Sequence, residues 1–94
     1  MYAVAFDLEV AAVVANHPKK NPSAAYAEIR NVLQKQGFVW RQGSLYTTND
    51  EDMAKLFKAI TDLKALPWFP ASVKDIRAFR VEQWSDFTSM VKTP

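Results

Sequence analysis

Cysteine is absent from this chain, and glycine and histidine are almost absent. With no Cys the chain can form neither disulfides nor thiolate metal sites, which fits a reducing, cytoplasmic environment. Only 2 Gly among 94 residues exclude a Gly-rich phosphate-binding loop, and the single His excludes a two-His ribonuclease site. No apolar run approaches the roughly 20 residues of a membrane-spanning helix. Asp7 and Glu9 interrupt the apolar N-terminal residues and no basic region precedes them, so we expect no signal peptide.

An excess of one charge is also missing. Lys and Arg number 12 against 10 Asp and Glu, so a net charge of +2 predicts no concentrated basic surface. Hydrophobic residues make up 49% of the chain and aromatic residues 13%, which is enough for the core of one domain. We therefore expect a single domain over residues 1–94, with about 83–94 as a C-terminal tail or short helix. A core this small is marginally stable alone, so we also expect oligomerisation.

The order of apolar patterns predicts the fold class. It comprises a strand over 2–8, a helix from Pro22 toward Gly37, two β segments between Phe38 and Thr48, a helix that ends before Pro67, and a strand over Val73–Glu82. The β segments around Gly43 fit either a hairpin or one strand kinked by a bulge, and residues 9–16 fit a short helix or a loop. The order β-α-β-β-α-β is that of a ferredoxin-like α+β fold, an antiparallel sheet with two helices on one face.

Local signals refine these expectations. Asn21 and Pro22 form a favourable helix start, and Asn49 or Asp50 is expected to cap the later helix. An apolar stripe on that helix is expected to be core, and it comprises Met53, Leu56, Phe57, Ile60 and Leu63. The charged last strand is predicted to be an edge strand or to line a polar groove. His17, in a loop with Pro and Lys, is expected to be solvated.

Asp7 is the most informative polar residue. It ends a strand after six apolar or aromatic residues. Either the strand has simply reached solvent there, or the carboxylate has a chemical role, because burial of an unpaired carboxylate is unfavourable. One Asp holds Mg²⁺ poorly, whereas a two-fold dimer that brought two copies of Asp7 together would form a better site.

The remaining candidates are weaker. Ser44 and Gln42 flank Gly43 and fit ordinary turn residues, and Glu9 is a weak second carboxylate. The basic pairs Lys19–Lys20 and Arg77–Arg80 could neutralise phosphate. Aromatic side chains could stack on RNA bases, although a place in the core is their commoner role; these are Tyr2, Tyr46 and Trp68.

Two long stretches of the chain resemble the virulence-associated protein D family, VapD. They are residues 1–8, MYAVAFDL, and residues 37–46, GFVWRQGSLY. Shorter stretches at 26–29, 67–69 and 72–82 extend the resemblance over nearly the whole chain. VapD is in turn similar to CRISPR-associated protein 2, which shares the strand-ending Asp and the Gln-x-Ser turn.

This resemblance implies a ferredoxin-like homodimer with endoribonuclease activity on RNA. In bacteria it implies a toxin role, in some members with a small antitoxin as partner. By position, the strand-ending Asp is Asp7 and the turn Ser is Ser44, the two residues expected to be catalytic. The residues expected to bind substrate are Gln42, Tyr46, Arg77 and Arg80, and Asp7 is the expected ligand if Mg²⁺ takes part.

The resulting hypothesis places two Asp7 carboxylates, one from each protomer, beside a groove at the dimer axis. They would hold Mg²⁺ or activate the attacking hydroxyl or water at an RNA phosphodiester. Ser44 would bind a phosphate or orient Asp7, and Arg77 or Arg80 would neutralise charge. The alternatives are a non-catalytic RNA-binding or scaffolding dimer, and a domain that binds a small metabolite.

Overall fold

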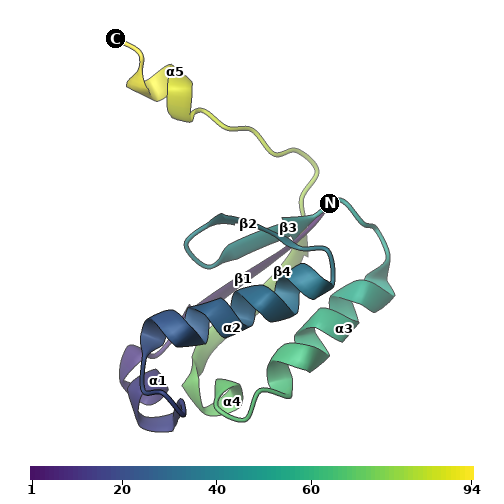
Figure 1. Ribbon diagram of the computed structural model, residues 1–94. Helices are drawn as coiled ribbons and strands as arrows, with labels where there is room; N and C mark the ends of the chain where they lie inside the picture. The colour runs from purple at the N-terminus through teal and green to yellow at the C-terminus, as the bar shows by residue number, and fades with distance from the viewer.

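A four-stranded antiparallel sheet forms the centre of the molecule (Figure 1). The computed structural model describes residues 1–94. The strands are β1 (Tyr2–Leu8), β2 (Val39–Gln42), β3 (Leu45–Thr48) and β4 (Val73–Arg80), in the order β2-β3-β1-β4. This order places β1 inside the sheet and makes β2 and β4 its edges. It confirms the ferredoxin-like α+β prediction. Of the two roles predicted for the last strand, it shows the edge strand, which ends at Arg80 rather than Glu82.

The helices gather on one face of the sheet (Figure 1). They are α1 (Val10–Asn16), α2 (Pro22–Lys35), α3 (Met53–Lys64) and the single turn α4 (Phe69–Ser72). Residues 10–16 are therefore helical, and β2 and β3 form a hairpin. The predicted start of α2 is confirmed, because the Asn21 side chain accepts a hydrogen bond from the Ser23 N–H at 2.9 Å.

The side chains of β1 alternate between the two faces of the sheet, as predicted. Its large residues point under α2 and α3 and belong to one core cluster; they are Tyr2, Val4, Phe6 and Leu8. Its small residues, with Asp7, lie on the face that no helix covers. That uncovered face is called the open face below.

The start and the buried stripe of α3 differ from the sequence prediction. Asp52, rather than Asn49 or Asp50, caps the helix by accepting a hydrogen bond from the Ala54 N–H. The expected core stripe is correct at Leu56 and Leu63 and wrong at Met53 and Phe57, since Phe57 is 67% exposed. The buried residues of α3 are Leu56, Ala59 and Leu63. Ile60 of α3 and Ile76 of β4 line one cavity, so α3 lies beside β4, while Met53 and Phe57 face solvent.

His17 is buried, so the expectation of a solvated loop residue is wrong. Its Nε2 lies 3.2 Å from Glu28 Oε2, and its Nδ1 accepts a hydrogen bond from the Lys19 N–H at 3.0 Å. The Trp68 ring packs edge-on against the imidazole with centroids 5.0 Å apart. Glu28 Oε2 also accepts from Trp68 Nε1 at 2.6 Å, which ties α1, α2 and the start of α4 together.

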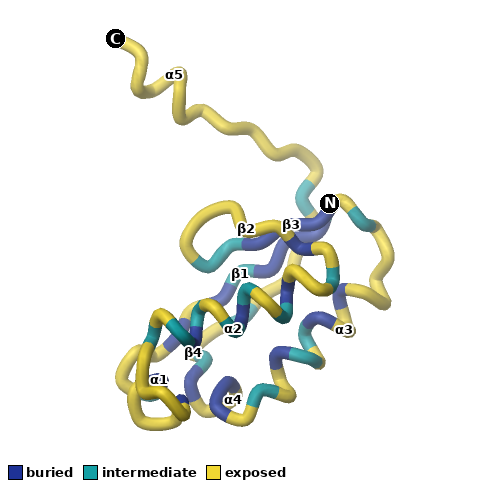
Figure 2. Tube along the Cα trace, viewed as in Figure 1, coloured by how far each residue is buried: buried dark blue, intermediate teal, exposed yellow.

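After β4 the chain leaves the body as an extended segment that ends in the short helix α5 (Thr88–Lys92) (Figure 1). Figure 2 shows this tail exposed along nearly its whole length. Its exposed side chains include large apolar ones, namely Trp84, Phe87, Met90 and Val91. No helix of the protein combines the length and apolar character that crossing a membrane requires.

Candidate active site

Asp7 lies on the open face of the central strand and is exposed. The strand continues to Leu8, which is buried under the helices. The carboxylate is therefore exposed because its face of the sheet is uncovered, while its backbone is still paired with β4, two residues past the last β1–β3 pair, Ala5–Leu45.

Asp75 on β4 is paired directly with Asp7 across the ladder. The register then shifts, so that Leu8 pairs with Val73 and Lys74 is the extra residue of a bulge. Bulges bend a strand and re-aim neighbouring side chains, and they are common beside active sites. The sequence prediction missed Asp75 as a site residue, because only the register of β1 against β4 reveals that it faces Asp7.

Arg77 extends this pair of carboxylates. It is opposite Ala5, so it shares the open face with Asp7 and Asp75. Its Nε donates to Asp75 Oδ2 at 3.1 Å, and the guanidinium remains largely exposed. Two carboxylates and one arginine thus form a single polar patch.

The β2–β3 turn brings Gln42 and Ser44 to the same end of the sheet. The Phe6 N–H, next to Asp7, donates to the Ser44 carbonyl at 3.2 Å. Gly43 has a φ of 48°, which glycine adopts more easily than other residues. The Gly43 carbonyl accepts a hydrogen bond from Trp40 Nε1 at 2.9 Å, which holds the turn in place. Ser44 is half-buried and Gln42 is exposed.

Arg80 and Tyr46 are not brought to this patch within one protomer. Arg80 is paired with Tyr2, five residues along β4 from the Asp75 pair and on the helix-covered side; that separation is about 17 Å. Tyr46 is buried and stacks on Phe6 with ring centroids 6.2 Å apart. Tyr2 and Trp68 are also buried, in accordance with the commoner role considered for these aromatic residues.

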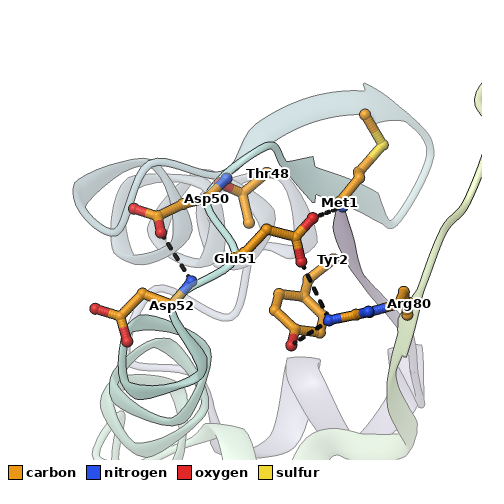
Figure 3. A network of polar contacts seen from close by, with 7 residues as sticks. All are labelled: Met1, Tyr2, Thr48, Asp50, Glu51, Asp52 and Arg80. Carbon is orange, nitrogen blue, oxygen red and sulfur yellow. Dashed lines mark hydrogen bonds and ion pairs between the residues drawn. The ribbon is translucent and has the colours of Figure 1, made fainter.

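Arg80 instead belongs to a network at the N-terminal end of β1 (Figure 3). It donates to the Tyr2 hydroxyl and to Glu51 Oε2, both at 3.3 Å, and Glu51 also accepts from the Met1 ammonium. The hydrogen bond from that ammonium lowers the pKa of Glu51, and the Tyr2 hydroxyl raises the pKa of Arg80. These contacts join β1, β4 and the loop before α3.

The patch around Asp7 is open in a single protomer. The protein has two cavities, and Asp7 lines neither of them. No three potential metal ligands of the His, Cys, Asp and Glu types gather in one protomer. Asp7 and Asp75 nevertheless fit Mg²⁺, which commonly takes one or two carboxylates and completes its shell with water and phosphate oxygens.

The family model described as CRISPR associated protein Cas2 matches residues 1–89. An endoribonuclease VapD homolog of Neisseria gonorrhoeae is 66% identical over 93 residues, which cover 99% of this chain and 100% of the relative. The endoribonuclease VapD of Haemophilus influenzae is 54% identical over 92 residues, 98% of this chain and 99% of the relative. The endoribonuclease VapD of Helicobacter pylori is 42% identical over 95 residues, 99% and 100% of the two chains. With its β2-β3-β1-β4 sheet and strand-borne Asp7, the chain belongs to the VapD proteins of the Cas2 family.

Proposed function

We propose that this protein is an endoribonuclease that cleaves phosphodiester bonds of RNA, with Asp7 as its central catalytic residue. The observation that supports this most is the pairing of Asp7 with Asp75 on the open face. Like charges placed directly opposite each other destabilise a sheet, so their presence there favours a chemical role. The names of the similar VapD proteins supply the reaction class.

The chemistry follows from the groups at this end of the sheet. Asp7 accepts the proton of the attacking hydroxyl or water, whose oxygen bonds to phosphorus while the bond to the leaving oxygen breaks. A water molecule protonates the leaving oxygen. Arg77 neutralises the phosphate, and Ser44 and Gln42 lie on the turn where they can donate hydrogen bonds to its oxygens. Mg²⁺ bound by Asp7 and Asp75 would polarise the phosphate.

The active form is proposed to be a homodimer that buries the open face. Val39 and Phe79 are large apolar residues on that face, and Phe79 is 47% exposed. The exposed apolar residues of the tail add further surface for a second copy. A dimer would also enclose Asp7, which no cavity of one protomer includes, and would bring in a second Asp7. A toxin role, a small antitoxin partner and a cytoplasmic location are proposed from the family resemblance.

Substitution of the paired carboxylates tests this function. We expect Asp7→Asn to slow cleavage of a purified RNA at least about 100-fold, because loss of a general base typically costs that much. Asp75→Asn should also reduce the rate. Asp62→Asn is the control, since this carboxylate lies on α3 and contacts only Lys58. Removal of one of two facing charges should leave the melting temperature of Asp7→Asn equal to or above that of the parent.

Equal cleavage rates for Asp7→Asn and the parent would contradict the assignment of Asp7. The non-catalytic alternative predicts a different result: RNA that migrates more slowly on a native gel with the parent protein but is not shortened. Preparations of a variant that carries both Asp7→Asn and Asp75→Asn, purified in parallel, control for a contaminating ribonuclease.

A further inference from the structure

Trp40 is a large aromatic residue left exposed beside the β2–β3 turn. Its side chain is 45% exposed, although it lies in an edge strand that packs beside α2. The aromatic residues that the sequence suggested for base stacking, Tyr2, Tyr46 and Trp68, are all buried. Trp40 therefore remains available to a ligand, as does Trp84 of the tail, which lines the same cavity as Trp40.

The Trp40 ring is held in one orientation by two contacts. The Arg30 guanidinium of α2 lies 4.4 Å from the ring centroid, and Nε1 donates to the Gly43 carbonyl at 2.9 Å. A ring fixed in this way loses little conformational entropy when a planar group stacks on it. The second contact joins the ring to the turn that carries Ser44.

Arg30 has no carboxylate partner. The two arginines of β4 are paired, Arg77 with Asp75 and Arg80 with Glu51, whereas Arg30 of α2 contacts the Trp40 ring and the Tyr46 hydroxyl. Its positive charge is thus not neutralised by the protein. A free arginine on an exposed indole combines a stacking surface with a group that binds phosphate.

Trp40 is connected to the strand that carries Asp7, from the opposite side of the sheet. Gly43 accepts from Trp40, and the adjacent Ser44 accepts from Phe6, so two hydrogen bonds connect the ring to the strand position before Asp7. Trp40 is opposite Tyr46 and hence lies on the helix-covered side of β2. A second copy that covers the open face would leave this side accessible.

We propose that Trp40 and Arg30 form a platform that binds one unpaired nucleotide of single-stranded RNA outside the cleavage position. The base stacks on the Trp40 ring and Arg30 binds an adjacent phosphate, the two contacts by which proteins hold single-stranded RNA. This inference rests on the proposed endoribonuclease function, whose substrate the platform would hold.

Fluorescence anisotropy with a labelled, unstructured RNA of ten nucleotides tests the platform in an Asp7→Asn background, where cleavage does not interfere. We expect Trp40→Leu to weaken binding about tenfold. In a series of RNAs that each lack one base, we expect one position at which the missing base weakens RNA binding by the parent protein by a similar factor. The same missing base should not weaken RNA binding by the Trp40→Leu protein any further. Arg30→Gln should reduce the slope of log affinity against log salt by about 0.7, the value for one phosphate contact on a single strand.

Phe57→Leu is the matched control, because Phe57 is an exposed aromatic residue on α3, at the opposite side of the helix layer. It should bind RNA as the parent does. The proposal of a platform is wrong if the Trp40→Leu protein binds RNA as tightly as the parent, or if every abasic site weakens RNA binding by both proteins equally. If the wild-type protein neither binds nor cleaves RNA, the endoribonuclease proposal itself is wrong.

Discussion

Single residues in this protein have roles that depend on which side of a strand they occupy. Arg77 and Arg80 are both basic and three positions apart in β4, yet only Arg77 shares the open face with Asp7. An odd separation in a strand always places two side chains on opposite faces. Arg77 and Arg80 therefore do not form one phosphate-binding pair within a protomer.

The burial of His17 could not be predicted from its neighbours in the sequence. A histidine between a short apolar segment and Pro18-Lys19-Lys20 is typical of a solvated loop. In the structure, its two ring nitrogens both have partners, and Trp68 packs on the ring. Trp68 and Glu28 are 51 and 11 residues away along the chain, so no local pattern indicates the contact.

We expect His17→Ala to lower the free energy of unfolding by about 2–4 kcal/mol, because it leaves a cavity against Trp68 and an unpaired Lys19 N–H. Urea unfolding at neutral pH and fixed protein concentration measures this. Lys19→Ala, an exposed neighbour that keeps its backbone N–H, should stay within about 0.5 kcal/mol of the parent. A His17→Ala protein as stable as Lys19→Ala would show that the cluster contributes little.

At the scale of elements, most of the fold follows from the sequence and most of the site geometry does not. The large–small alternation of β1, the Asn21–Pro22 helix start and the edge position of β4 are local or compositional signals, and all three are confirmed. The facing of Asp7 and Asp75 depends on the register of two strands far apart in the chain. The partial exposure of the α3 stripe depends on how far that helix lies from the centre of the sheet.

The polar network at the start of β1, formed by Met1, Tyr2, Glu51 and Arg80, links elements that lie far apart in the sequence. Glu51 contacts both the Met1 ammonium and Arg80, and the ammonium lowers the pKa of Glu51 from its ordinary value of 4.5 (Figure 3). A carboxylate whose pKa is lowered by folding stabilises the folded state above its ordinary pKa. That contribution is lost as the pH falls through the lowered folded-state value.

We therefore expect Glu51→Gln to melt at a lower temperature than the parent at neutral pH, with the difference shrinking as the pH falls below about 4. The effect should be small, because the pair is exposed and screened by salt. Circular dichroism melts across a pH series provide the measurement. Glu82→Gln, an exposed carboxylate with no ion pair, should show the same pH profile as the parent, and a constant difference for Glu51→Gln would contradict the expectation.

At the scale of the whole molecule, the two faces of the sheet are unequal. One face is packed under α2 and α3, while no helix covers the other (Figure 1). That second face carries apolar and charged residues. The tail adds large apolar residues that remain exposed. A small domain with this much uncovered apolar surface is typical of one half of an assembly.

We expect the wild-type protein to sediment as a dimer and Phe79→Asp to dissociate toward monomer, because a charge on the open face would be buried against the partner. Analytical ultracentrifugation over a range of concentrations distinguishes the two states. Phe57→Asp makes the same change at a more exposed residue on the helix side and should remain dimeric. A wild-type monomer at all concentrations, or a Phe79→Asp protein as dimeric as the parent, would contradict the proposed assembly.

The central place of β1 has a consequence for how the molecule opens. Its N–H groups donate alternately to β3 on one side and to β4 on the other, so the amides before Asp7 are all released together only when both ladders break. Exchange of those amides with solvent should then require an opening close to global unfolding, whereas the tail exchanges freely. Asp7 is thus carried by one of the last segments to lose its structure, while the groups proposed to meet RNA around it lie on an edge strand and a turn that can adjust.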